Sequence, residues 1–173
     1  MALVVETGAG LANAESYISV ADATTYHAAM GNAAWSALAS DTIREQLLRK
    51  ATAYMVQAHQ LKITGYRTVL TQALDLPRTY MTDSRKNING WIYYVDFNTV
   101  PVEFKNACAI LALKANTVTL LPDVKQQVIS KTIAGAISKT YDSNSSPLTK
   151  YSEIESMLKP FFLNAGSQGF IHR

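Results

Sequence analysis

The sequence predicts a mainly α-helical protein with a four-helix bundle-like core, a β-hairpin insertion and a short N-terminal strand. Apolar residues recur at the spacing of a helix face in four separate segments. The tetrapeptide Ile-Ser-Lys-Thr occurs twice around an Ala-Gly pair, which is typical of a hairpin. With 173 residues, of which 48% are hydrophobic and 17% charged, the chain is long enough to bury one core without a metal or a disulfide.

Two helices are expected in the first third of the chain. Residues 3–6 form a short strand that ends before Gly8, and Ser19 caps a helix that stops at Gly31. Trp35 and Leu38 lie in the connection that follows. A second helix begins at Ser40 and ends before Gly65. Its apolar face comprises Ile43, Leu47, Ala51, Tyr54, Ala58 and Leu61.

Residues 65–100 form a long connection without a helix. Pro77 favours an extended or turned backbone before it, residues 87–90 are a turn signal, and residues 91–95 form a short strand. A connection of this length is usually functional or ordered by packing on a neighbour.

The third helix begins at Pro101, and its broad apolar surface places it in the centre of the core or at a subunit interface. A last helix, lined by Tyr151, Ile154, Leu158 and Phe161, should end or kink at Pro160. Between them, residues 128–141 form the hairpin. A three-residue loop around Gly135 would oppose Lys131 and Lys139, whereas a two-residue turn would oppose Lys131 and Ser138; the register stays open.

Composition argues against several classes of function. The net charge of +3 is too small to indicate nucleic-acid binding alone. The single cysteine, Cys108, excludes an internal disulfide and a cysteine zinc site, and its apolar surroundings predict a buried small hydrophobe. No signal peptide is visible, and residues 106–113 are too short to span a bilayer. We therefore expect synthesis in the cytoplasm, without membrane association.

No catalytic, cofactor-binding or metal-binding residues are predicted, and the chain is not expected to be an enzyme. The three histidines fall in separate segments, and His59 near a helix end is interpreted as solvated or as compensating the helix dipole. The glycines at positions 8 and 10 lack the remaining residues of a phosphate-binding loop.

Single-stranded DNA binding is the main alternative to a structural role. Arginines and lysines mixed with aromatic residues can follow phosphates and stack bases. We favour a solvent-exposed charged face with aromatic residues that pack the connection. The residues concerned are Arg44, Arg49, Lys50, Lys62, Arg67, Arg78, Arg85 and Lys86, with Tyr80, Trp91, Tyr93 and Tyr94.

The segment Leu74-Asp-Leu-Pro-Arg78 is predicted to be an anchored turn. Leu74 and Leu76 fill apolar pockets, Pro77 limits the entropy lost on ordering, and Arg78 reaches a carboxylate or a backbone carbonyl. The pattern is equally compatible with a segment that packs only inside its own chain and with one that contacts the next subunit.

Three segments, residues 8–23, 26–35 and 71–79, together closely resemble the small head–tail adaptor proteins of tailed bacteriophages. That family is often labelled DnaT-like and single-stranded-DNA-binding, although its members look like ring-forming connector subunits. The resemblance covers residues 3 to about 162, as one domain 1–162, and weakens at a variable insertion, residues 82–99. Residues 163–173 are expected to be a flexible tail.

The resemblance implies a virion protein of the head–tail neck, made in the host cytoplasm. It would form a homo-oligomeric ring, dodecameric to match the portal protein, and contact a tail-side neck, stopper or tail protein. Genomic DNA would pass through the ring without sequence-specific contact, near Lys131 and Lys139 of the hairpin. The expected interaction residues are Leu74, Leu76, Pro77, Arg78, Lys131 and Lys139, with Phe170, Ile171 and Arg173 in the tail.

Overall fold

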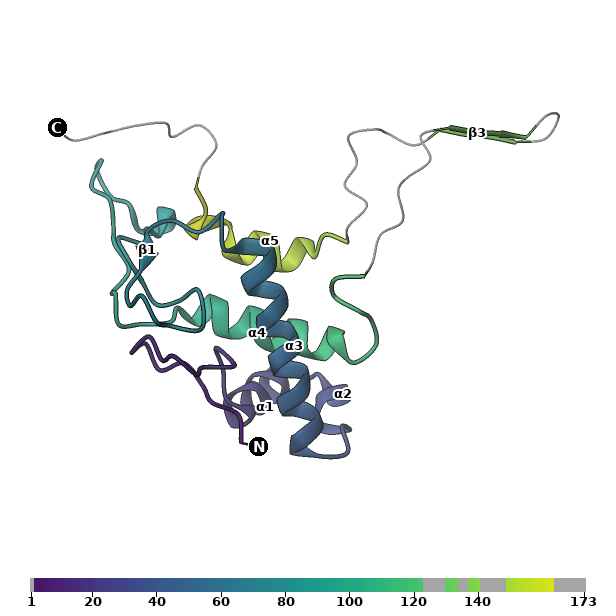
Figure 1. Ribbon diagram of the computed structural model, residues 1–173, viewed down its shortest axis with the longest axis horizontal. Helices are drawn as coiled ribbons and strands as arrows, with labels where there is room; N and C mark the ends of the chain where they lie inside the picture. The colour runs from purple at the N-terminus through teal and green to yellow at the C-terminus, as the bar shows by residue number, and fades with distance from the viewer. Residues whose placement is uncertain (1, 123–129, 134–136, 141–148, 164–173) are drawn as a thin grey trace.

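The computed structural model describes residues 2–122, 130–133, 137–140 and 149–163, and these are mainly helical (Figure 1). The α-helices are α1 (Val20–Ala29), α2 (Ala33–Ser36), α3 (Asp41–His59), α4 (Val102–Ala115) and α5 (Ser152–Leu158). The 3-10 helices are η1 (Ser84–Lys86) and η2 (Lys159–Phe161), and the strands are β1 (Tyr66–Arg67), β2 (Arg78–Thr79), β3 (Ser130–Ile133) and β4 (Ile137–Thr140). The four predicted helices are confirmed, and α2 adds one short helical turn around Trp35.

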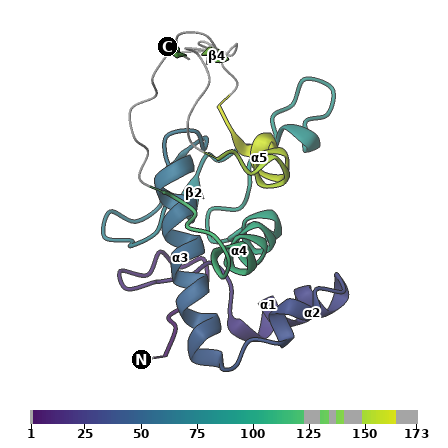
Figure 2. The same ribbon diagram turned by 90° about the vertical axis from the view of Figure 1, so that its right-hand side faces the viewer.

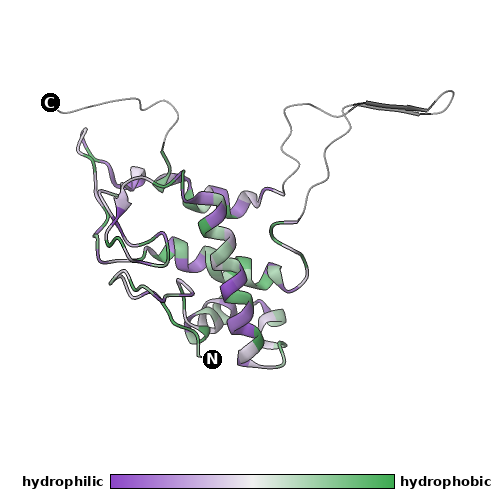
Figure 3. Cartoon of the chain, viewed as in Figure 1, coloured by the Kyte–Doolittle hydropathy of each residue, from purple (hydrophilic) through white to green (hydrophobic). Residues whose placement is uncertain are grey.

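Helix α4 is the centre of the core. It contacts α1, α3 and α5, and Figures 1 and 2 show α3 running across it with α1 and α5 on either side. Phe104 and every residue from 107 to 112 are buried, and hydrophobic residues recur along the helix (Figure 3). The predicted central position of this helix is therefore confirmed, and Pro101 lies at its N-cap.

Helix α3 begins as predicted, because the Ser40 hydroxyl accepts a hydrogen bond from the backbone N–H of Ile43. Leu47, Ala51 and Tyr54 are buried, but Leu61 is 86% exposed, so its place on the apolar face was wrong. The helix ends at His59, and the chain then turns, which rotates Leu61 off the helical face.

At the N-terminus, the expected strand is reduced to one parallel bridge between Val5 and Ser16. The Glu6 carboxylate is buried and accepts hydrogen bonds from the backbone N–H groups of Gly8, Gly10 and Leu11. The carboxylate thus accepts hydrogen bonds that a neighbouring strand would otherwise accept, and it holds residues 6–11 in a turn.

The connection between α3 and α4 contains short β pairs and η1. Strands β1 and β2 pair antiparallel. Asn89 and Gly90 have positive φ values of 51° and 82°, and Ile88 bridges Trp91, which confirms the predicted turn. The expected strand at residues 91–95 is limited to isolated bridges at Trp91 and Tyr94.

The register of the hairpin is the one with a three-residue loop. Strands β3 and β4 are antiparallel, with Lys131 opposite Lys139 and Ile133 opposite Ile137. The alternative with Lys131 opposite Ser138 does not occur. Of the predicted hairpin 128–141, these two strands are the described part.

Candidate functional site

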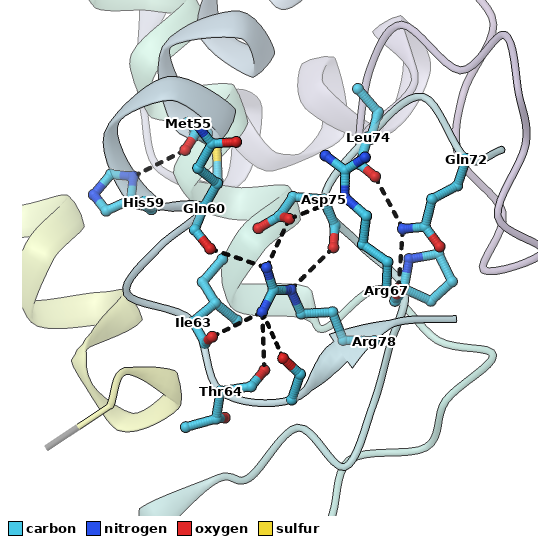
Figure 4. A network of polar contacts seen from close by, with 12 residues as sticks. Met55, His59, Gln60, Ile63, Thr64, Arg67, Gln72, Leu74, Asp75 and Arg78 are labelled. Atoms are coloured by element: carbon cyan, nitrogen blue, oxygen red, sulfur yellow. Dashed lines mark hydrogen bonds and ion pairs between the residues drawn. The ribbon is translucent and has the colours of Figure 1, made fainter. Parts of the chain in front are cut away.

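The turn that contains Arg78 is organised around the arginine itself (Figure 4). Its guanidinium donates to the backbone carbonyls of Gln60 at 2.9 Å, Ile63 at 2.8 Å and Gly65 at 2.8 Å. These carbonyls belong to the chain just after α3, where the helix leaves acceptors unpaired. Arg78 thus ties the end of α3 to β2.

A carboxylate completes this network. Asp75 Oδ1 accepts from the Arg78 guanidinium at 2.7 Å and lies 3.5 Å from Nε of Arg67. Asp75 is almost fully buried, and its backbone N–H donates to the hydroxyl of Tyr17. Burial, together with the nearby Asp75 charge, raises the pKa of Tyr17. The main partner of Asp75 therefore lies only three residues later in the chain.

The rest of the predicted turn packs inside the same chain. Leu74, Leu76 and Pro77 are buried, with Leu76 completely so, and the Leu76–Pro77 peptide bond is cis. The amide of Gln72 donates to the carbonyls of Leu74 and Pro77. The contacts of this turn therefore support the intramolecular alternative for Leu74, Leu76, Pro77 and Arg78.

Residues 87–97, which we call the aromatic loop, carry large apolar side chains on the surface. Trp91 is 80% exposed. The loop lies beside the core before α4 (Figure 1). Its exposed apolar residues are Ile88, Trp91, Ile92, Tyr93, Tyr94 and Phe97. Exposed apolar side chains gathered in one segment are typical of an interaction surface.

The basic residues next to the aromatic loop are largely neutralised. Asp83 is buried and binds Arg85 at 2.8 Å and Lys86 at 3.8 Å, while Arg85 also pairs with Glu103. The hydrogen bond from Arg85 lowers the pKa of Asp83, and the same bond raises the pKa of Arg85. The ammonium of Lys86 lies 4.8 Å from the centre of the Tyr93 ring. Little uncompensated positive charge remains here.

Three of the other basic residues considered for DNA, Arg44, Arg49 and Lys62, also form ion pairs within the chain. Arg44 pairs with Asp41 and donates to three carbonyls, two at the end of α2 and one in the turn before α3. Arg49 pairs with Glu15 at 2.9 Å and with Glu45, one helical turn earlier in α3. Lys62 pairs with Glu155. The predicted basic set is thus dispersed over several internal ion pairs rather than gathered into one stripe.

The two hairpin lysines occupy facing positions, as their register requires, so the structure brings Lys131 and Lys139 together. Phe170, Ile171 and Arg173 lie outside the described residues, as does the predicted tail from residue 164 onward. Their interaction roles stay predictions.

Two histidines are buried rather than solvent-exposed. His27 has Nε2 3.0 Å from the carbonyl of Ala109 and Nδ1 3.1 Å from the amide of Asn32. His59 lies in the last turn of α3, between the Met55 carbonyl and Glu155. The interpretation of His59 as solvated is wrong, because Phe162 stacks on its ring. Burial lowers the pKa of both histidines.

Cys108 is fully buried, as predicted, and its Sγ lies 3.3 Å from the hydroxyl of Thr52. Burial raises the pKa of this thiol, which keeps it in the unreactive protonated form. Within the described part of the chain, no group of three His, Cys, Asp or Glu residues could hold a metal ion. None of the described helices is both long and apolar enough to cross a membrane.

Sequence reasoning missed several polar residues that organise these segments. Glu6 is followed by Gly8 and Gly10, whose backbone N–H groups donate to its carboxylate. Asp75 precedes its partner Arg78 by three residues. Both patterns are readable in the sequence. Asp83 likewise precedes Arg85 by two residues and Lys86 by three, so its pairing is also readable in the sequence. Gln72 carries no comparable signal, because its amide binds the backbone carbonyls of Leu74 and Pro77, whose positions depend on the path of the turn.

The chain matches the family described as "Putative DnaT-like ssDNA binding protein" over residues 1–173. It belongs to this family. The family description corresponds to the single-stranded-DNA alternative of the sequence interpretation, and it does not mention a head–tail adaptor. No curated protein and no solved structure matches the chain.

Proposed function

We propose that this family member is a structural virion protein: a head–tail adaptor that forms a ring under the portal protein and extends the DNA channel toward the tail. The observation that carries the proposal is the exposed aromatic loop on a well-packed helical core. Such a surface gains free energy when another protein covers it, at about 25 cal/mol per Å² of apolar area.

The charges around the loop favour a protein partner over nucleic acid. Protein–nucleic acid affinity depends mainly on cations that neutralise phosphates. Residues 80–97 contain two acidic and two basic residues, and Arg85 and Lys86 already bind Asp83. Phosphates would have to compete with this buried carboxylate, whereas an apolar protein surface would not.

The proposed partners follow from the resemblance to phage adaptors. The ring is dodecameric, to match the symmetry of the portal, and its tail side binds a neck, stopper or tail protein. Lys131 and Lys139 provide loosely placed positive charge for DNA that passes through the lumen. The C-terminal residues dock on the portal or on the neighbouring subunit. The protein acts in the virion neck and has no catalytic role.

Binding of single-stranded DNA is the second candidate function. The family description favours it, as does the Lys86 ammonium over the ring of Tyr93 beside the exposed Trp91. Aromatic rings stack on bases and add about 1–3 kcal/mol per base. In this case the aromatic loop would be the stacking surface.

One comparison of variants tests both functions. Trp91→Ala removes an exposed aromatic side chain from the loop, and Leu70→Ala is the matched control, because Leu70 is 98% exposed on a different loop. Portal-containing particles that lack the protein are mixed with each variant, sedimented and imaged at the neck. We expect wild type and Leu70→Ala to join the particles and Trp91→Ala to join at least tenfold more weakly.

The same three proteins are titrated with a fluorescent oligonucleotide at about 50 mM and 200 mM salt. The adaptor proposal predicts weak binding that does not depend on Trp91. The adaptor proposal would give way to single-stranded-DNA binding if the oligonucleotide bound in a salt-dependent way, Trp91→Ala abolished that binding, and no protein density were seen at the neck.

A further inference from the structure

A groove lies on the opposite side of the molecule from the aromatic loop. Ala115 at the end of α4 and residues 116–121 after it, together with α3, line a groove of about 520 Å³. Its walls include Lys50, Ala53, Tyr54 and Gln57 of α3, with Val118 and Leu121 opposite them. Val118 and Leu121 are partly exposed, so the groove presents apolar surface to a partner.

The groove continues toward α5. A second hollow of about 420 Å³ shares Tyr54, Gln57, Leu120 and Leu121 and adds Lys62, Lys150 and Glu155. The two hollows together form what we call the α3 groove. It contains three lysines and one glutamate, so its net charge is positive.

The aromatic loop and the α3 groove lie at opposite ends of α4. The loop leads into Pro101, the N-cap of α4, whereas Ala115 at the last turn of α4 lines the groove. Fourteen residues of helix separate these points, or about 21 Å at 1.5 Å per residue. Figure 1 shows the connection that leads into α4 and the segment that follows α4 on opposite sides of α3. Two copies arranged along α4 would therefore bring the loop of one to the groove of the next.

The charges of the two surfaces are complementary. Asp96 is the single charged residue of the aromatic loop, it is exposed, and no ion pair is found for it among the described residues. Lys50 and Lys150 of the α3 groove are likewise exposed and without an ion pair in the described chain. The aromatic loop thus carries one negative charge, and the α3 groove carries an excess of positive charge.

We propose that the aromatic loop of one copy occupies the α3 groove of the next copy, with Asp96 directed toward Lys50. This inference rests on the proposed ring-forming function and specifies its subunit contact. Because the two surfaces differ, the contact is heterologous, and repeated rotation can close it into a ring. Each copy presents both surfaces, so every copy in a closed ring has its aromatic loop covered.

Cross-linking distinguishes this arrangement from a symmetric dimer. Cys108 is fully buried, so the wild-type chain is the control without an accessible thiol. The variant Asp96→Cys with Lys50→Cys is treated with a short bismaleimide at high protein concentration. We expect a ladder of dimer, trimer and larger products on a denaturing gel, whereas each single variant gives no ladder. Dimers from a single variant, or no ladder from the double variant, would overturn the proposal.

Charge reversal provides a second measurement that needs no cross-linker. Asp96→Lys and Lys50→Asp should each weaken self-association at least tenfold by sedimentation velocity, and the combination should restore it. Additive weakening in the double variant would exclude the Asp96–Lys50 contact. Circular dichroism checks that all variants are folded; both positions are exposed.

These results separate the contact from the proposed function. A ladder from the purified chain together with no protein at the virion neck would retain the contact and remove the adaptor role. Density at the neck whose subunits do not cross-link through these positions would retain the adaptor role and remove the contact.

Discussion

At the scale of single residues, buried polar side chains determine how the irregular segments fold. Arg78 satisfies carbonyls at the end of α3, and Glu6 satisfies backbone N–H groups near the N-terminus. Buried donors and acceptors need such partners, because an unpaired one costs about 1–3 kcal/mol. These side chains therefore hold loops that contain little regular secondary structure.

Replacement of Arg78 should be strongly destabilising. Arg78→Ala leaves Asp75 and several carbonyls buried without a donor, so we expect the free energy of unfolding to fall by about 3–5 kcal/mol. Urea unfolding followed by circular dichroism measures the change. Arg67→Ala is the control: Arg67 approaches the same carboxylate but is 40% exposed, so its loss should cost less than about 1 kcal/mol. If Arg78→Ala lowered the free energy of unfolding as little as Arg67→Ala, the Arg78 network would contribute little to stability.

Acidification should destabilise the protein through its buried histidines. Burial lowers the pKa of His27 and His59 from 6.5, so the unfolded chain binds more protons than the folded chain in the window just below that value. The free energy of unfolding should therefore be largest above this window and fall as the pH drops through it. For His59, Lys62 supports the lowering, and Glu155 opposes it.

Urea titrations between about pH 8 and pH 5 test this expectation. On acidification, the free energy of unfolding should fall less in His27→Gln and in His59→Gln than in the wild type. A free energy of unfolding that rises on acidification would contradict the burial argument.

At the scale of elements, caps and apolar spacing account for the helices. Ser19 and Ser40 cap α1 and α3 at the predicted positions, and α5 ends at Leu158, where the 3-10 turn η2 with Pro160 follows it. The strand predictions for residues 3–6 and 91–95 were less accurate, because these segments form only isolated β-bridges and pair with no long strand. Strand pairing depends on a distant segment, whereas a helix satisfies its own backbone.

Gly8 packs closely against the backbone of Asn98, just after the aromatic loop. Its φ is 104°, and an added Cβ would lie 1.8 Å from the carbonyl oxygen of Asn98. Gly31 also has a positive φ but has open space around it. Gly31→Ala should cost about 1–2 kcal/mol from backbone strain alone. Gly8→Ala should cost about 1–3 kcal/mol more because of the steric overlap. Thermal unfolding of both variants measures the difference; equal losses would mean that residues 98–99 can move away freely.

At the scale of the whole molecule, one tryptophan lies in the core and the other lies on the surface of the aromatic loop. Trp35 is fully buried and donates to the hydroxyl of Thr24, whereas Trp91 is exposed. Core packing and surface assembly are therefore separable by substitution.

Trp35→Ala should lower the free energy of unfolding by about 3–5 kcal/mol, because it leaves a cavity in the core. Trp91→Ala should change it by less than about 0.5 kcal/mol. Urea unfolding gives both values. In the wild type, iodide should quench only the Trp91 part of the fluorescence, and assembly should protect that part. A large stability loss in Trp91→Ala would show that the loop belongs to the core.

The sequence by itself determined the helices, the central place of α4, the buried Cys108 and the position of the hairpin, because caps and apolar periodicity act over neighbouring residues. The resemblance seen in the sequence also pointed to the family labelled DnaT-like, and the match over residues 1–173 shows that membership. Only the tertiary structure decided that Arg78 binds inside the chain, that His59 is buried, and that Arg49 and Lys62 pair with the distant Glu15 and Glu155. These outcomes depend on segments far apart in sequence whose charges and carbonyls meet only after the core has packed.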